Sequence, residues 1–468
     1  MTKLVLTLLL FVGIGWSQMY CSTLASDPQQ VTEDGVVLLE VSTQALVVNG
    51  TFWYDTPNTR VCVQTFDASV PSGHVMEAAA RSYAATMSAQ EYVTFQGLTL
   101  TGAQHAGLYA TGNFTGTTVT GVTANTNHAD GIELFYPVAD AVQNVLVTNT
   151  TASYNGGSGI WLLSQAFGAG IVLSGNTTNY NSQIQTGTGD YQFVAGTYVN
   201  CSGGSSPGNT STITVTNTVS AYNNPAGVFP DTDSVGAGIW SDTCANVTAS
   251  HNSTAHNWGA GILLENNNNS KAIYNVSNGD AVNNSTGADD HAMALWMVAD
   301  GGTASDGNQL LNNTIYGGTV GLGVQAQGAG ASITNATVEN NISYSNTFYQ
   351  FYADGRSSGT LGVGNVFEYQ NLGADSSAAL SYYNGSAYST YATLQTALGY
   401  TTHDVAGDPL FTNPGAGDFT LQAGSPAIGA GVYIAVVSTK NPPDLGAFQF
   451  VGGSVIISGK VMVGGKVF

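Results

Sequence analysis

The feature that most constrains this chain is an internal repeat. Between about residues 91 and 370 the same order of elements returns: a strand rich in Val, Ile, Thr and Leu, an Asn-rich turn, and a strand that opens with a small residue and Gly-Ile. Clear copies stand at Thr126–Leu134, Ser153–Leu162 and Ala255–Leu264. A unit this short cannot bury its apolar face by itself, so the repeat predicts units that stack on one another.

The spacing of the repeat predicts a parallel β-helix. The Gly-Ile pairs that end at Ile132, Ile160, Ile239 and Ile262 are separated by 28, 79 and 23 residues, which suits coils of roughly 20 to 30 residues. The strands are short, and no recurring helical pattern lies between them to make βαβ crossovers. We therefore expect an all-β solenoid whose coils stack about 4.8 Å apart.

The turn residues fit the same architecture. Gly accounts for 59 of the 468 residues, and Gly and Asn adopt the left-handed backbone conformations that the corners of a coil need. Asn side chains can also form hydrogen bonds with one another along the rod.

Five segments follow from the pattern. Residues 1–26 form an expected signal peptide, because Lys3 precedes the apolar run Leu4–Val12 and small residues at Gly15/Ser17 or Thr23/Ala25 offer cleavage positions. N-terminal strands and a cap follow at 27–90, and the β-helix occupies 91–370 with a loop insertion at 171–237, a coil that carries long loops. Residues 371–450 form an irregular C-terminal capping segment with a short helix at Ala387–Leu398, and 451–468 form a β-rich tail.

Charge and cysteine content exclude several classes. Acidic residues outnumber basic ones 29 to 8, for a net charge of −21, which repels nucleic acid and anionic membranes. No later run approaches the roughly 20 apolar residues of a membrane helix. We expect a secreted or cell-surface monomer without membrane insertion. Four Cys cannot form a disulfide framework, and Cys201 and Cys244 could either pair or remain two isolated thiols.

Three C-terminal motifs carry a family resemblance. The segments DPLFTNPGAGDFTL at 408–421, GSPAIGAG at 424–431 and DLGAF at 444–448 resemble the C-terminal signature of secreted bacterial right-handed parallel β-helix repeat proteins, in the pectate-lyase-like superfamily. The resemblance implies a right-handed β-helix. The group that the chain resembles includes polysaccharide lyases, epimerases and members of unassigned activity. This chain departs from the group by a shortened N-terminal cap.

An outward row of side chains is the first candidate site. If the Ile of each Gly-Ile pair points inward, the next residue points outward, which aligns Glu133, Trp161, Trp240, Leu263 and Trp296. A row of exposed indole faces would stack sugar rings, so Trp161, Trp240 and Trp296 are candidate polysaccharide-binding residues. The alternative is that these Trp lie beneath the long loops as a satellite core.

Carboxylates near this row are candidate catalytic groups. Asp130, Glu133, Asp242 and Glu265 form a sparse acidic line of the type that a glycosidase uses as acid and base or nucleophile. The alternative is a set of solvated turn and strand carboxylates. His128 and His291 are candidate proton carriers or ordinary polar turn residues.

Metal and lyase chemistry have weaker support. Asp289 and Asp290 are candidate oxygen ligands for Ca²⁺, with Asp280, Asp300 and Asp306 nearby, and no other cofactor is expected. A lyase needs a cationic group to neutralise the sugar carboxylate. Lys271 and Arg356 are the only basic residues within the repeat region, and they form no dyad at a common coil position.

Two functions remain open at this stage. The first is a carbohydrate-active enzyme, a polysaccharide lyase or a glycoside hydrolase, that uses acidic residues on the outer row. The second is a non-catalytic glycan-binding or cell-surface adhesion protein. Family resemblance favours the first, and the scarcity of basic residues favours the second.

Overall fold

The computed structural model describes most of the chain from residue 19 onward. The described residues are 19–24, 27–28, 30–34, 36–79, 81–136, 142–165, 167–182, 194–201, 212–224, 236–281, 293–375, 380–435, 437–451, 454–456, 462–463 and 466–467. The expected signal sequence up to residue 18 and the pair Asp289 and Asp290 lie outside these residues.

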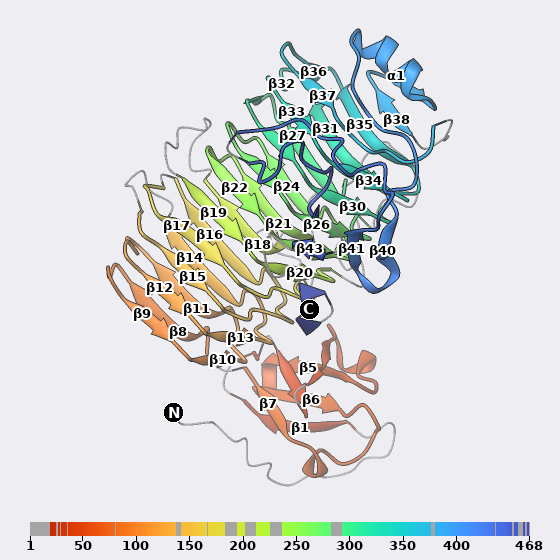
Figure 1. The fold of residues 1–468 in the computed structure, drawn as a ribbon. Coiled ribbons are helices and arrows are strands. Elements are labelled where there is room, and N and C mark those ends of the chain that lie inside the picture. Colours follow the sequence, from red (N-terminus) through yellow and green to blue (C-terminus); the bar gives the residue numbers. More distant parts are fainter. Residues whose placement is uncertain are drawn as a thin grey trace.

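The described chain winds into a right-handed parallel β-helix (Figure 1). Its long sheet has 12 strands, parallel except at the last pair, where a hairpin ends it. In chain order these strands are β8 (Tyr83–Ser88), β11 (Ala106–Thr111), β14 (Ile132–Tyr136), β16 (Ile160–Ser164), β18 (Ala195–Asn200), β21 (Ala237–Asp242), β24 (Ile262–Glu265), β27 (Leu295–Ala299), β31 (Val320–Gln327), β35 (Tyr349–Arg356), β38 (Ser381–Tyr383) and β39 (Ser386–Tyr388).

Two further walls complete each coil. The second sheet contains β9 (Thr94–Gln96), β12 (Thr118–Thr120), β15 (Leu146–Thr148), β17 (Ile171–Ser174), β19 (Ile213–Thr216), β22 (Val247–Ser250), β25 (Lys271–Ile273), β29 (Gln309–Leu311), β33 (Thr337–Glu339) and β37 (Val366–Glu368). The third wall is made of shorter pieces: β10 (Thr99–Thr101), β13 (Thr123–Asn125), β20 (Val219–Ala221), β23 (Ser253–Ala255), β26 (Val276–Asn278), β30 (Thr314–Tyr316) and β34 (Ile342–Tyr344). A short side sheet adds β28 (Ala304–Asp306), β32 (Ser332–Thr334) and β36 (Thr360–Leu361).

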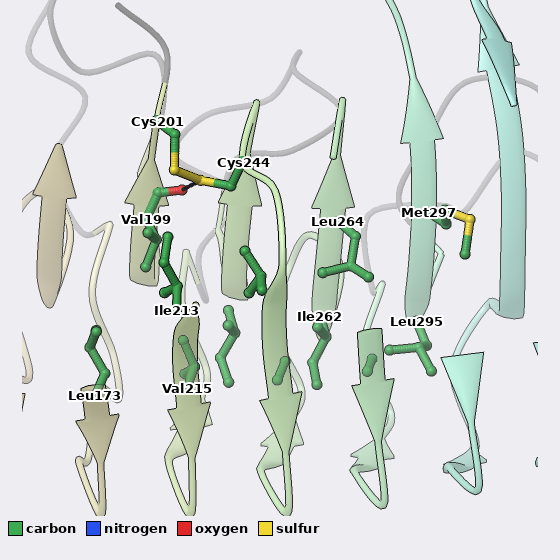
Figure 2. Close-up of a cluster of buried hydrophobic side chains, with 14 of the residues drawn as sticks. Leu173, Val199, Cys201, Ile213, Val215, Cys244, Ile262, Leu264, Leu295 and Met297 are labelled. Carbon is green, nitrogen blue, oxygen red and sulfur yellow. Dashed lines mark hydrogen bonds between the residues drawn. A yellow bond between two sulfur atoms is a disulfide. The ribbon is translucent and has the colours of Figure 1, made fainter. Parts of the chain in front are cut away.

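The core is a continuous apolar column inside the rod, part of which is drawn in Figure 2. Ile132, Ile160, Ile239 and Ile262 are each at most 1% exposed and stand in one row of the long sheet, where Thr197 fills the position between Ile160 and Ile239. The predicted inward direction of the Gly-Ile pairs is therefore confirmed.

Buried Asn side chains join the coils at two corners. In the first ladder the backbone N–H of each Asn donates to the side-chain oxygen of the residue one coil further on, through Asn127, Asn155, Asn181, Asn223, Asn257 and Asp280. A second ladder runs through Asn252, Asn275, Asn313, Asn341 and Gln370. These side chains occupy turns whose backbone groups would otherwise be buried without partners.

Aromatic residues also occupy left-handed corner positions, which we had assigned to Gly and Asn. Tyr154, Tyr180 and Tyr222 have φ values of 59°, 55° and 56°, and their rings stack with centroids 4.9 and 5.0 Å apart. His256 extends the stack at 5.1 Å. Ring stacking between successive coils offsets the steric cost of this backbone conformation.

The N-terminal unit forms two small sheets below the rod in Figure 1. Its elements are β1 (Tyr20–Thr23), β2 (Val31–Glu33), β3 (Val36–Val37), β4 (Leu39–Glu40), η1 (Gln44–Leu46), β5 (Thr51–Asp55), η2 (Thr56–Asn58), β6 (Arg60–Gln64), η3 (Pro71–Gly73) and β7 (Met76–Ala78). A disulfide joins Cys21 on β1 to Cys62, its partner on β6. Strand β1 lies within residues 1–26, the segment expected to be a signal peptide, and pairs with β6. The rod begins at β8, ahead of the expected residue 91.

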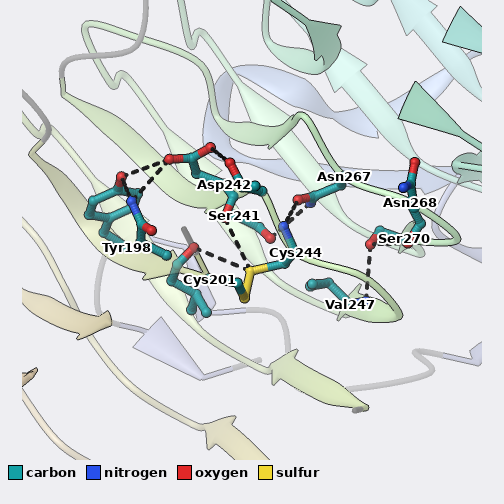
Figure 3. The surroundings of a disulfide bond; sticks show 12 residues. Tyr198, Cys201, Ser241, Asp242, Cys244, Val247, Asn267, Asn268 and Ser270 are labelled. Atoms are coloured by element: carbon teal, nitrogen blue, oxygen red, sulfur yellow. Dashed lines mark hydrogen bonds between the residues drawn. A yellow bond between two sulfur atoms is a disulfide. The ribbon is translucent and has the colours of Figure 1, made fainter. Parts of the chain in front are cut away.

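The segment 171–237 contributes a coil of its own. Strands β17, β18, β19 and β20 each pair with, or are bridged to, the coils on either side, so the interval of 79 residues between Gly-Ile pairs spans two coils. Cys201, after β18, forms a disulfide with Cys244, after β21 (Figure 3). The sequence left open whether these two thiols pair or remain isolated, and the structure shows that they form a disulfide.

The C-terminal segment closes the rod at its end and along one side (Figure 1). Helix α1 (Tyr391–Leu398) buries Tyr391 and Leu394 and ends at Gly399, which has φ 81°. It begins later than predicted, because Ser386–Tyr388 instead pair with β38 as strand β39. The remaining elements are β40 (Phe411–Asn413), η4 (Pro414–Ala416), β41 (Asp418–Leu421), β42 (Gln449–Val451), β43 (Ser454–Ile456), β44 (Met462–Val463) and β45 (Lys466–Val467).

Residues of the three C-terminal motifs cover the third wall. Phe411, Phe419, Leu445 and Phe448 form one buried cluster with Ile342 and other residues of that wall. A hydrogen bond also joins the second and third motifs: the backbone N–H of Gly429 donates to the buried carboxylate of Asp444 at 2.7 Å. The tail strands β42–β45 pair as two hairpins in their described residues.

Among the helices of the described residues, none is long and apolar enough to cross a membrane.

We expect the Asn ladders to contribute strongly to stability. Asn275 donates to Ala249 O and Asn313 Oδ1, each at 3.0 Å, and accepts two hydrogen bonds from Asn252. Asn275→Ala leaves several of these buried groups unpaired, so it should lower the free energy of unfolding by about 2–4 kcal/mol. Denaturant unfolding should show this loss, whereas the exposed control Asn413→Ala should stay near wild type. Equal midpoints for the two variants would contradict the role of the ladder.

Candidate functional site

The outer face of the long sheet carries the predicted row in register. Glu133 pairs with Trp161, and Trp240 pairs with Leu263, which pairs with Trp296. Tyr198 on β18 fills the position between Trp161 and Trp240. The prediction that these residues align along the rod is confirmed, and the additional coil inserts an aromatic ring that we had not placed there.

The prediction that this row is an exposed sugar-stacking surface is wrong for two of its three Trp. Trp240 and Trp296 are 1% and 2% exposed, and Tyr198 is 1% exposed. They belong to a second buried cluster on the outside of the sheet, which Trp161 joins as a half-buried member. The spacing of the coils explains part of this burial, because it brings the ring of Tyr198 to 4.4 Å from that of Trp240 and so occupies faces that a sugar would need.

The four predicted carboxylates form two separate groups. Asp130 and Glu133 belong to the coil of β14, whereas Asp242 and Glu265 are direct partners on β21 and β24. Strands β16 and β18 lie between β14 and β21, which separates the groups by about 14 Å at the usual strand spacing. The single acidic line expected from the sequence is therefore two sites.

The central group, which we call the central acidic cluster, consists of Asp242, Glu265 and Asp300. Figure 3 shows Tyr198 and Asp242 side by side. Asp242 Oδ2 accepts hydrogen bonds from the Tyr198 hydroxyl at 3.1 Å and from Asn200 Nδ2 at 3.0 Å, and its Oδ1 accepts one from Thr243 Oγ1 at 2.7 Å. These donors stabilise a negative charge on Asp242.

Asp300 adds a third carboxylate from the next coil. Its Oδ1 accepts from Asn266 Nδ2 at 2.5 Å, and its backbone N–H donates to Asn266 Oδ1 at 2.9 Å. The charge of Asp300 acts on both Asp242 and Glu265. Asp242, Glu265 and Asp300 are all partly exposed in the described structure.

Burial and mutual repulsion perturb the titration of this cluster. Burial, together with the charges of Asp242 and Asp300, raises the pKa of Glu265 well above its usual range. Burial also raises the pKa of Asp242, although the hydrogen bonds from Thr243 and Tyr198 oppose the increase. Because like charges oppose one another's ionisation, the neighbouring carboxylates favour the protonated form of Glu265.

The other group lies at the N-terminal end of the rod and includes two His. His105 Nε2 lies 2.8 Å from Glu133 Oε2. Asp130 and Glu133 are 2% and 4% exposed, and Asp130 Oδ1 accepts from the backbone N–H of Ser158 at 2.6 Å. Burial, and then the charge of Glu133, raise the pKa of Asp130 to about 8. Burial also lowers the pKa of His128 to about 4.

The Ca²⁺ prediction stays a prediction, because Asp289 and Asp290 lie outside the described residues, as does His291. The three Asp that we grouped with them have separate surroundings. Asp280 is fully buried and accepts hydrogen bonds from Thr254, Ser277 and Asn257. Asp306 accepts from Thr334 and Asn335, and Asp300 belongs to the central acidic cluster.

Sequence reasoning missed Tyr198, Asn200 and His105, and it grouped Asp300 with the candidate Ca²⁺ ligands instead of with Asp242 and Glu265. A signal for the first two exists, since AGTYVN at 195–200 has the same frame as AGIWSD at 237–242. The Gly of that strand is not followed by Ile, so the strand lacks the Gly-Ile pair that marks the other coils. For His105 and Asp300 we find no local signal, because each lies just outside a strand and meets its neighbours only through the stacking of coils.

A sequence model of the right-handed β-helix region matches residues 81–277. The chain contains a right-handed β-helix region. No curated protein matches the chain.

Three solved structures are similar in fold. A complex of XylC with xylose has 10% identity and a TM-score of 0.49, over 82% of this chain and 68% of that one. The A-module of the mannuronan C-5 epimerase AlgE4 from Azotobacter vinelandii has 13% identity and a TM-score of 0.34, over 60% and 64%. Pectate lyase Pel9A has 16% identity and a TM-score of 0.35, over 74% and 73%. At these identities and TM-scores the likeness carries no conclusion about this chain.

The raised pKa of Glu265 predicts a dependence of stability on pH. In the folded state Glu265 keeps its proton to a higher pH than in the unfolded state, where its carboxyl has the ordinary pKa of 4.5. The free energy of unfolding therefore falls as pH rises from 4.5 through the pKa of Glu265 in the folded state. Glu265→Gln cannot ionise, and its stability should fall less over this range. Denaturant unfolding at a series of pH values checks this, with the exposed Glu77→Gln as control. A wild-type slope in Glu265→Gln would contradict the assignment.

Proposed function

We propose that this protein is an exported glycan-active enzyme that hydrolyses a glycosidic bond at the central acidic cluster. The observation that carries the proposal is the pairing of Asp242 and Glu265 on neighbouring strands of the long sheet, with perturbed pKa values and partial exposure. A glycosidase needs two such carboxyl groups in different protonation states.

The surroundings assign a role to each carboxyl. Glu265, whose pKa is raised most by burial and by its acidic neighbours, holds a proton and serves as the general acid. Asp242 accepts three hydrogen bonds from side chains, so it carries the charge and serves as nucleophile or base. Partners on adjacent strands stand about 4.8 Å apart, which is closer to the separation of about 5 Å found in retaining enzymes than to the larger one of inverting enzymes.

Hydrolysis is favoured over elimination by the charges at the cluster. In the described structure, the charges that shift the pKa values of Asp242 and Glu265 come from other carboxylates. A lyase must neutralise the carboxylate of a uronic sugar, and a group of carboxylates repels it. A neutral glycan therefore suits the cluster better than a polyuronate.

Export is part of the proposal. The apolar segment that follows Lys3 is typical of a secretory signal, and two disulfides suit an oxidising compartment. The half-buried Trp161, whose ring lies 6.2 Å from that of Tyr198 on the same face, is the remaining member of the predicted Trp row that could contact a sugar.

Activity on a panel of neutral and uronic polysaccharides tests the proposal. We expect new reducing ends from a neutral glycan, and a loss of about 10²- to 10⁴-fold in Asp242→Asn and Glu265→Gln. The matched control is Glu339→Gln, because Glu339 and Glu368 also pair on neighbouring strands, but in the second sheet. This control should keep wild-type activity.

Three results would contradict hydrolysis. An unsaturated uronate product would establish elimination. Retention on a polymer without any product would favour the non-catalytic glycan-binding protein. Full activity in Asp242→Asn and Glu265→Gln would place the chemistry elsewhere on the rod.

A further inference from the structure

The cluster of His105, Asp130 and Glu133 has the arrangement of a group of metal ligands. One donor atom from each residue lies within 4.8 Å of the donors of the other two. The residues come from adjacent coils, since His105 precedes β11 and the two acids flank the start of β14, and the backbone N–H of Ala129 donates to His105 O at 2.9 Å. The ladder between these strands therefore holds the three side chains together.

The hydrogen bonding of Glu133 differs from that of a carboxylate in an ordinary ion pair. Its Oε2 is buried and accepts no hydrogen bond from the described residues, although His105 Nε2 lies 2.8 Å away. A buried carboxylate oxygen with no hydrogen bond is costly unless a cation neutralises it.

His128 supplies a second buried atom in need of a partner. It is 5% exposed, and its Nδ1 makes no hydrogen bond within the part of the chain that the structure describes. Its backbone N–H donates to Ala103 O, two residues before His105, and the charge of His105 acts on its ring.

A similar set of residues elsewhere in the chain shows the contrast. Glu33, Asp34 and His74 also gather within 4.8 Å, but their polar atoms are engaged by hydrogen bonds. His74 contacts Asp34 Oδ2 at 2.8 Å and Ser69 Oγ at 2.7 Å, and Glu33 Oε2 accepts from the backbone N–H of Phe66 at 2.8 Å. Hydrogen bonding to Asp34 raises the pKa of His74, which favours the imidazolium form that cannot bind a metal.

We propose that His105, Asp130 and Glu133, with His128 beside them, bind a divalent first-row transition metal ion such as Zn²⁺. Imidazole nitrogen with carboxylate oxygen is a ligand set that suits Zn²⁺, whereas Ca²⁺ takes six to eight oxygen ligands. The side chain of His105 is 33% exposed, so the ion can enter from solvent. This site is separate from the central acidic cluster, and the proposal does not depend on the proposed function.

Zn²⁺ binding to the full-length protein tests the site. After treatment with a chelator and dialysis, calorimetric titration with a zinc salt should show one strong site per chain. His105→Ala and Glu133→Gln should each weaken binding by more than about 10-fold, and His74→Ala should not change it. Circular dichroism should verify that each variant is folded. Two ligand variants are used so that one of them still tests the site if the other misfolds.

Each other outcome would overturn the assignment. Absence of strong Zn²⁺ binding to the wild-type protein would show that the cluster is only an ion pair. Loss of binding in His74→Ala, with His105→Ala and Glu133→Gln unaffected, would place the ion in the N-terminal unit. Equal affinity for Ca²⁺ and Zn²⁺ would be inconsistent with ligation by imidazole.

Discussion

Parallel ladder hydrogen bonds between successive coils fix the positions of the core, corner and outer-face residues of the rod. A coil such as the one containing β21 and β22 has no apolar interior of its own, and it gains one only by lying against its neighbours. Because the ladders are parallel and in register, residues at equivalent positions form straight rows along the rod. The inward rows of Ile and the corner ladders of Asn are two results of the same constraint.

The constraint acts on the outer face as well. Side chains in one outward row are separated by a single strand spacing, so aromatic residues such as Tyr198 and Trp240 stack on each other and like charges such as Asp242 and Glu265 repel. A row of rings therefore becomes an additional buried cluster. A row of carboxylates becomes a proton-binding site, because the sheet does not let its members move apart.

Polar groups inside the rod follow a related rule. Asn257 meets Asp280 where the preceding coils place an Asn, and the carboxylate accepts hydrogen bonds from four donors. Burial raises the pKa of Asp280, and these hydrogen bonds oppose the increase. A buried acid whose oxygens all accept hydrogen bonds is thus a structural element, whereas Glu133, whose Oε2 accepts none from the described residues, is a candidate ligand.

The sequence by itself determined the architecture, the inward direction of the Gly-Ile pairs, the register of Glu133, Trp161 and Trp240, and the apolar face of the helix at Tyr391 and Leu394. These depend on a period of two along each strand and on the repeat, which local residues encode. Tertiary structure decided that Trp240 and Trp296 are buried, that the four acids divide between two sites, and that Asp300 and His105 belong to those sites. It also placed the C-terminal motifs against the third wall. Burial and electrostatic coupling arise between coils and covering segments far apart in sequence, so no local pattern could reveal them.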